Sequence, residues 1–90
     1  MFLARVIGEL VSTIKHESLH AQTLLIIDRI DLEDHQTGAT LIAVDSVSAG
    51  VGDTVLVVDE GGSAAIVTGL ADPPIRTVIV GIVDHFDVEV

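Results

Sequence analysis

The apolar residues of this 90-residue chain gather in short runs that are rich in valine and isoleucine and are bounded by turn residues. Short runs of this composition are typical of β-strands, because side chains branched at Cβ pack well on a pleated sheet. No long segment has the apolar repeat of an amphipathic helix. The sequence therefore predicts an all-β fold. Five runs carry this prediction: TLLIIDRI (23–30), TLIAVD (40–45), DTVLVVD (53–59), AAIVT (64–68) and TVIVGIVD (77–84).

The opening segment, residues 1–14, is predicted to be one long strand that a glycine interrupts. Gly8 falls on the face that carries the apolar side chains, and a glycine inside a strand commonly marks a bulge or a barrel corner. In the run from Leu24 to Ile27 both faces are apolar. We expect one face of such strands to fill a core and the other to meet a neighbouring subunit. The apolar face of the opening strand consists of Phe2, Ala4, Val6, Leu10 and Ile14.

The segments between the runs have the composition of turns. Residues 31–38 predict a polar hairpin loop, residues 48–52 a glycine-rich turn and residues 60–63 a tight turn. Residues 72–74, Asp-Pro-Pro, predict one short helical turn, since aspartate caps a helix and proline suits its first turn. Five or six short strands in a single domain, residues 1–90, indicate a small OB-like β-barrel.

The charge balance is strongly acidic, with four Lys and Arg against fourteen Asp and Glu, a net charge of −10. Residues 31–90 carry all of this net charge, so nucleic acid would be repelled, and the two Phe offer no platform for stacking bases. No apolar run approaches the roughly 18 residues of a membrane helix. Without cysteine there are no disulfides or thiolate sites. We expect a cytoplasmic protein that binds neither nucleic acid nor membrane and buries its surplus apolar surface against other subunits.

The histidines offer one pattern that would suit a metal site. His16 and His20 are four residues apart and would share a face of a helix, and His35 is a further candidate ligand. The segment around the first two, KHESLHAQ, lies between predicted strands and has no helical repeat beyond one turn. We therefore interpret these side chains, and His85, as solvated loop histidines.

No residue pattern predicts catalysis. Most of the acids flank strands or lie in loops, where solvated carboxylates are ordinary. Ser46, Ser48 and Ser63 have no local histidine partner and no nucleophile-elbow pattern. Residues 49–52, Ala-Gly-Val-Gly, lack the lysine and the following helix of a phosphate-binding loop. We expect no catalytic residue, no metal and no cofactor.

Four stretches of the chain, in order and spacing, resemble the EutN/CcmL family of bacterial microcompartment vertex proteins. The segment GGSAA (61–65) departs from the family pattern, which often has an arginine there, and the tail HFDVEV (85–90) is not covered by the resemblance. The most specific stretch is the central glycine motif. The four stretches are DSVSAGVGDTVLV (45–57), MFLARVIG (1–8), KHESLHAQTLLIID (15–28) and PPIRTVIVGIVD (73–84).

The resemblance implies a β-barrel that forms a cyclic homopentamer and caps the five-fold vertices of an icosahedral microcompartment shell. It also implies hexameric shell proteins as partners, a place in the shell within the cytoplasm, and no enzymatic role. Two alternatives stay open. One is an OB-like module that binds a small ligand or a peptide, and the other is a small metal-dependent enzyme that uses His16, His20 or His35.

Assembly of an acidic chain constrains where its acidic side chains can lie. Five copies that each carry −10 repel one another, so we expect the acids on exposed faces and around residues 31–38, away from subunit contacts.

Glycine lets backbones approach a neighbour or a symmetry axis closely. Together with the resemblance, this predicts that the glycine-rich turn lies near the five-fold axis. Its residues are Ser48, Ala49, Gly50, Val51 and Gly52.

Overall fold

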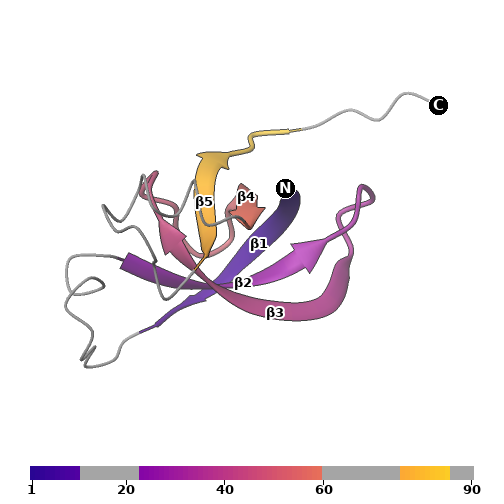
Figure 1. Cartoon of the computed structure of the whole chain (residues 1–90). Helices are drawn as coiled ribbons and strands as arrows, with labels where there is room; N and C mark the ends of the chain where they lie inside the picture. Colours follow the sequence, from indigo (N-terminus) through magenta and orange to yellow (C-terminus); the bar gives the residue numbers. More distant parts are fainter. Residues whose placement is uncertain (11–22, 60–75, 86–90) are drawn as a thin grey trace.

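The computed structural model describes residues 1–10, 23–59 and 76–85, and these form a closed β-barrel (Figure 1). Around the barrel the strands follow the order β1-β2-β3-β5-β4, and β4 pairs back to β1. All neighbours are antiparallel except β3 and β5, which run parallel over two residue pairs. The prediction of an all-β, OB-like barrel is confirmed. The strands are β1 (Phe2–Glu9), β2 (Thr23–Ile30), β3 (Gln36–Asp45), β4 (Thr54–Asp59) and β5 (Thr77–Ile82).

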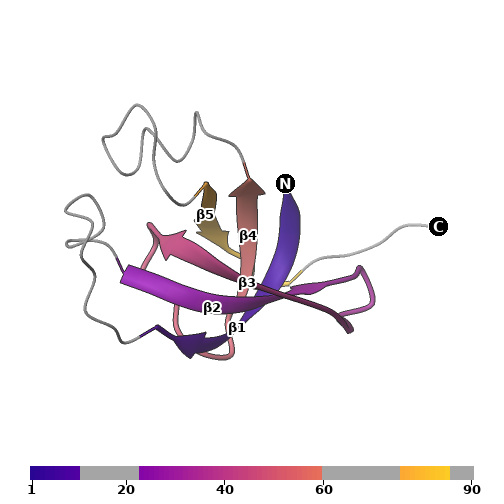
Figure 2. The ribbon, with the colours of Figure 1, turned by 60° about the horizontal axis from the view of Figure 1, so that its bottom comes forward.

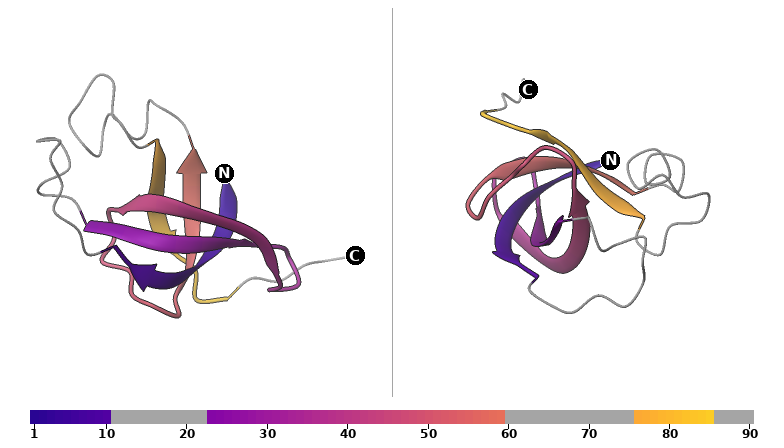
Figure 3. Two further views of the ribbon diagram at one scale, coloured as in Figure 1. Left: turned by 90° about the horizontal axis from the view of Figure 1, so that it is seen from below. Right: turned by 90° about the vertical axis from the view of Figure 1, so that its left-hand side faces the viewer.

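Two strands are longer than the barrel that they help to close. Figures 2 and 3 show β2 and β3 continuing together, as a twisted hairpin, beyond the ends of β4 and β5. The register explains this shape, because β3 pairs with β2 from Gln36 to Asp45 but with β5 only at Val44 and Asp45. The hairpin therefore stands out from the barrel along most of β3.

Four of the predicted runs recur as strands. The bounds of β2 coincide with the predicted run, and β4 and β5 lie inside theirs. The predicted strand at 64–68, the tight turn at 60–63 and the helical turn at 72–74 lie outside the described residues, as does the end of the opening strand after Leu10. Within the described part of the chain, no helix is long and apolar enough to cross a membrane.

The predicted loop at 31–38 is too long at its C-terminal end, because β3 already begins at Gln36. Gln36 pairs with Ile30 across the hairpin, and the Thr37 hydroxyl donates a hydrogen bond of 3.1 Å to the carbonyl oxygen of Arg29. Gly38 has φ of +86°, which a glycine adopts without strain. Gln-Thr-Gly has the composition of a turn, but Gln36 pairs with β2 and the strand continues through an irregularity to Thr40.

The bulge predicted at Gly8 is confirmed. Val6 pairs with Ile27 and Gly8 pairs with Ile26, so Ile7 is an extra residue in β1 without a partner residue in β2. An extra residue of this kind bends its strand and increases its twist. β1 can therefore curve round to meet β2 on one side and β4 on the other.

The interior of the barrel is filled from all five strands. Side chains such as Val6, Ile27 and Ile79 are at most 1% exposed and belong to one cluster. A second buried cluster is formed by Leu24, Val44 and Val78, which alternate in sequence with members of the first. The full first cluster comprises Ala4, Val6, Leu25, Ile27, Ala43, Val55, Val57 and Ile79.

The two clusters refine the expectation for strands with two apolar faces. Part of the second face, at Leu24, Val44 and Val78, is buried within the chain itself. Other apolar residues, including Ile7 and Ile42, are 42% exposed and remain available to a neighbour. Being apolar on both faces therefore does not by itself identify a contact surface.

Truncating a central core residue should unfold the barrel more easily than truncating an exposed one. Ile27→Ala removes a fully buried side chain and should lower the free energy of unfolding by about 2–5 kcal/mol. Leu32→Ala, at a residue 61% exposed, should change it by less than about 0.5 kcal/mol. Urea unfolding at equal protein concentration measures both, and equal effects of the two changes would contradict this assignment of the core.

Candidate functional site

The predicted glycine-rich turn connects β3 to β4 and begins at an aspartate cap. The carboxylate of Asp45, the last residue of β3, accepts hydrogen bonds from the backbone amides of Val47 and Ala49, each at 3.0 Å. Ser48 between them has φ of +59°, in the left-handed region. The Ser46 hydroxyl donates to the carbonyl oxygen of Ile79 in β5 at 2.5 Å. The start of the turn is therefore fixed to the barrel on both sides.

The second half of the turn is closed by Asp53. The amide of Gly50 donates to the Asp53 carboxylate at 2.8 Å, and the amide of Asp53 donates to the carbonyl oxygen of Gly50 at 3.0 Å. Two more backbone hydrogen bonds link Gly52 and Asp53 to Val6 of β1, at 2.8 and 3.0 Å. Gly52 has φ of +96°, so glycine is required by the backbone here. The turn is a rigid extension of the barrel wall.

The exposed part of this turn is small and uncharged. Val47 and Ala49 pack against the core, whereas Ser48, Gly50 and Gly52 are exposed and Val51 is 68% exposed. Gly50 does not have positive φ, and a Cβ there would meet nothing closer than the Asp53 carboxylate at 3.9 Å. Neither the backbone nor the space inside this chain requires glycine at 50. The turn can make a close contact with another molecule, but it offers no group for acid–base or metal chemistry.

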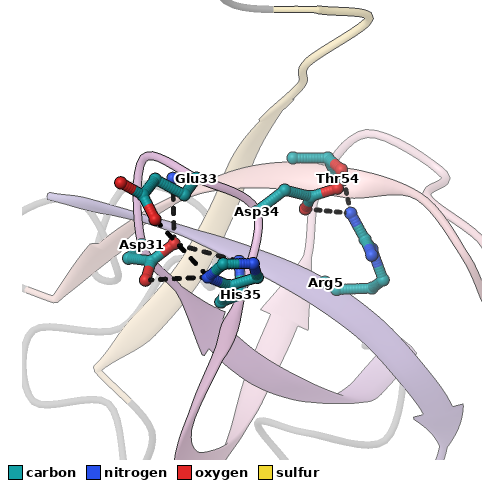
Figure 4. A network of polar contacts seen from close by, with 6 residues as sticks. All are labelled: Arg5, Asp31, Glu33, Asp34, His35 and Thr54. Atoms are coloured by element: carbon teal, nitrogen blue, oxygen red, sulfur yellow. Dashed lines mark hydrogen bonds and ion pairs between the residues drawn. The ribbon is translucent and has the colours of Figure 1, made fainter.

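A polar network fixes the tip of the β2–β3 hairpin (Figure 4). The guanidinium of Arg5 in β1 donates to the Asp34 carboxylate and, at 3.3 Å, to the Thr54 hydroxyl at the start of β4. Asp34 and Arg5 are far apart in the sequence, so this connection could not be predicted from local patterns. It ties the hairpin loop to β1, which pairs with β2, and to β4, which pairs with the other edge of β1.

Asp31 organises the same loop from within. Its Oδ1 accepts hydrogen bonds from the amides of His35 and Glu33, both at 2.9 Å. The amide of His35, and to a smaller extent that of Glu33, lowers the pKa of the Asp31 carboxyl from its ordinary value of 3.8, because these bonds favour the charged form. The carboxylate acts as a loop cap rather than as a reactive group.

The candidate metal ligands do not come together in the described residues. His35 lies in the exposed loop, with Nδ1 at 3.8 Å from Asp31 Oδ2 and 3.7 Å from Glu33 Oε2. His85 is exposed beyond β5, and His16 and His20 lie outside the described residues. Among residues 1–10, 23–59 and 76–85, no group of three or more His, Cys, Asp or Glu side chains could hold a metal ion.

The net charge predicts that the acids lie on exposed faces, and none of the described acids is buried. In the described part of the chain no polar or charged residue is buried. The half-buried acids are engaged, since Asp45 and Asp53 cap the turn and Asp28 accepts a hydrogen bond from the Thr40 hydroxyl at 2.6 Å. Their place relative to subunit contacts stays a prediction. The exposed acids are Glu9, Asp31, Glu33, Asp34, Asp59 and Asp84.

A family model described as ethanolamine utilisation protein EutN/carboxysome matches residues 1–84. The chain belongs to the EutN/CcmL family. The resemblance inferred from four stretches is thus confirmed over nearly the whole sequence, and the match ends just before the tail that the resemblance did not cover.

Relatives in the EutN/CcmL family agree in sequence and in structure. GrpN of Rhodospirillum rubrum, a bacterial microcompartment shell vertex protein, is 42% identical over 84 residues, which are 93% of each chain. The shell vertex protein EutN of Salmonella typhimurium is 37% identical over 85 residues, 94% of this chain and 85% of EutN. The solved structure of GrpN, a pentameric microcompartment shell protein, matches with a TM-score of 0.83 at 38% identity and covers 99% of both chains.

The two exposed glycines of the turn should respond differently to alanine. Gly52→Ala should lower the free energy of unfolding by about 1–2 kcal/mol, because L-residues resist positive φ. Gly50→Ala should not lower the stability of the folded chain, since the added methyl group meets nothing closer than the Asp53 carboxylate at 3.9 Å. Denaturant unfolding of the pair measures the difference, and equal destabilisation would show that the backbone of the turn is not as described.

The hairpin loop should loosen in acid. Because the folded pKa of Asp31 is lowered, its carboxylate stabilises the loop at pH values above the unfolded pKa, and this contribution is lost as pH falls through the folded pKa. NMR titration should give a midpoint for Asp31 below 3.8, compared with the ordinary value in the urea-unfolded chain. A midpoint at or above the unfolded value would contradict the capping hydrogen bonds.

Proposed function

We propose that this EutN/CcmL chain is a structural shell protein that forms a cyclic homopentamer and caps the five-fold vertices of an icosahedral bacterial microcompartment. The observation that carries this is similarity along almost the whole chain to shell vertex proteins, including a pentameric one at 38% identity. The chain has no enzymatic role and works in the shell, within the cytoplasm. Its function depends on its shape and on its contacts with other shell subunits.

The partners follow from the geometry of a closed shell. A flat sheet of hexameric tiles cannot close into a polyhedron without five-fold units, so hexameric shell proteins are the neighbours of the pentamer. Within the pentamer each copy uses two different surfaces, because a ring is built from heterologous contacts. Two contacts of about 800 Å² each would cover somewhat more than a quarter of the 5579 Å² surface of one chain. With a net charge of −10, neither nucleic acid nor an acidic membrane surface is a partner.

A ligand-binding module is the alternative that an OB-like barrel allows, and the described residues form a hollow in which a ligand would have to fit. The hollow has a volume of about 360 Å³. Its polar side chains are already engaged within the chain: the Arg29 guanidinium lies 4.8 Å from the centre of the Phe2 ring, and Asp31 caps its own loop. Ligand sites have convergent polar groups that are free to fix the ligand. The hollow therefore does not favour this alternative. Its lining is Met1, Phe2, Leu3, Arg29, Ile30, Asp31, Leu32 and Thr37.

Coexpression with a hexameric microcompartment shell protein tests the vertex role. With this chain present, electron microscopy should show closed polyhedral particles that contain it in the purified fraction. The hexameric protein alone should form open sheets or tubes. Closed particles of equal number without the chain, or particles that exclude it, would contradict the proposal.

The turn at 48–52 lies near the five-fold axis in this proposal, which assigns the role of Gly50 to assembly. Gly50→Leu should reduce the pentamer fraction at least tenfold by analytical ultracentrifugation, while circular dichroism and the unfolding midpoint of the monomer stay close to wild type. A bulky side chain fits on the free monomer but not where five copies converge.

Glu33→Leu is the matched control, because it places the same side chain on an exposed loop whose acids are expected to lie away from subunit contacts. This variant should remain pentameric. If Gly50→Leu destabilises the monomer as much as the assembly, the turn acts in folding and its place near the axis is wrong.

A further inference from the structure

Among the described strands, most of β3 is paired along one edge only. That edge pairs with β2, with an irregularity between Gln36 and Thr40, whereas β5 reaches the other edge only at Val44 and Asp45. Along residues 36–43 no described strand pairs with the free edge, and every residue from 36 to 42 is exposed. Figures 1 and 3 show this part of β3 standing out from the barrel. Backbone N–H and C=O groups along such an edge are a template for another strand.

This edge carries neither charge nor proline to keep another strand away. Between Gln36 and Val44 there is no charged residue and no proline, and this is the longest stretch without charge in the described residues. The stretch also exposes apolar side chains, since Leu41 is 37% and Ile42 is 42% exposed. A solvent-facing edge is normally blunted by Lys, Pro or a bulge. The register of β3 is irregular only near the hairpin tip, between Gln36 and Thr40, so the edge from Thr40 onward is regular and suited to a partner strand.

The edge is held ready for a partner. The Arg5–Asp34 ion pair ties the hairpin tip to β1, and the Thr37 and Thr40 hydroxyls bond back to β2. A rigid surface loses little conformational freedom on binding, so more of the contact energy is available for association.

The charge of the molecule indicates what covers the edge. A basic partner would be attracted to the acids of the hairpin loop, Asp31, Glu33 and Asp34, rather than to an uncharged strand. A second copy, itself at −10, can approach closely only where acids are absent. The charge-free strand leads directly into the turn at 46–52, and the one acid between them, Asp45, is occupied by two amides. An uncharged surface thus extends from the hairpin to the turn.

We propose that the free edge of β3 at residues 40–42 is one of the two subunit contacts of the ring, where a neighbouring copy adds its backbone to the barrel wall. This inference rests on the proposed homopentamer and specifies one of its interfaces. The contact combines main-chain hydrogen bonds along the edge with packing on Ile42, as in other cases of strand addition.

An exposed leucine outside the edge provides a control. Ile42 lies on the edge strand and is 42% exposed, whereas Leu32 is 61% exposed and lies in the hairpin loop, which is expected to lie away from subunit contacts. Ile42→Lys should shift the chain from pentamer to monomer in size-exclusion chromatography with light scattering, whereas Leu32→Lys should remain pentameric. Each variant adds one positive charge to an acidic chain and so lowers the overall repulsion between copies, which means that a loss of assembly has to come from the site itself.

Hydrogen exchange of the wild-type protein gives a reading that does not depend on a variant. In an antiparallel pair the amides of one strand point alternately toward and away from the partner. In the pentamer, both sets of amides in residues 40–42 should therefore be protected, and the outward set should exchange at least roughly tenfold more slowly than after dilution of the wild type to its monomer.

The outcomes separate this inference from the proposed function. A pentameric wild type in which Ile42→Lys stays pentameric, or in which both variants dissociate alike, overturns the edge contact. Rapid exchange of the outward amides in the wild-type pentamer also overturns it, even if Ile42→Lys fails to fold. A wild-type chain that is not a pentamer contradicts the proposed function instead.

Discussion

The structure depends on the short parallel pairing between β3 and β5, which closes the barrel. Only Val44 and Asp45 of β3 take part in it, opposite Val78 and Ile79. Val44 and Val78 are fully buried at this closure, and the carboxylate of Asp45 leaves the sheet to cap the turn toward β4. The rest of β3 lies beyond the closure, and no described strand pairs with its second edge. The barrel, the turn and the edge thus follow from one constraint, which is that only Val44 and Asp45 of β3 pair with β5.

Charge is the second constraint, because a protein that assembles with itself must reconcile contact with a net charge of −10. The described acids are either exposed or hydrogen-bonded within the chain, and none is buried. Asp31, Asp45 and Asp53 each bind backbone amides of their own turns, which uses negative charge to stabilise loops instead of presenting it to a neighbour. The surface of β3 and of the turn that follows it is uncharged and available for contact. The acids therefore stabilise loops, whereas the uncharged surface is available for contact with a neighbouring subunit.

Local patterns predicted most of the barrel and little of its connections. The β-branched runs predicted β2 residue for residue, and Gly8 predicted the bulge in β1. Residues 36–38 have the composition of a loop, and they belong to β3 because Gln36 pairs with Ile30 and Thr40 with Asp28 on either side of an irregularity. The Arg5–Asp34 pair joins distant segments and has no local signal. Similarly, Val44 and Ile42 lie on one face of one strand, and only the tertiary structure decides which of them is buried. Family membership came from the motif around the turn, because barrel strands alone are shared by many proteins.

The central claim is that five copies of this chain form a closed ring, and native mass spectrometry of the purified full chain tests it most directly. The ring requires heterologous contacts that close after five rotations, so the account predicts a dominant species of five times the chain mass, with little of any other size. A monomer or a dimer as the dominant species at micromolar concentration would contradict it, since neither can occupy a five-fold vertex.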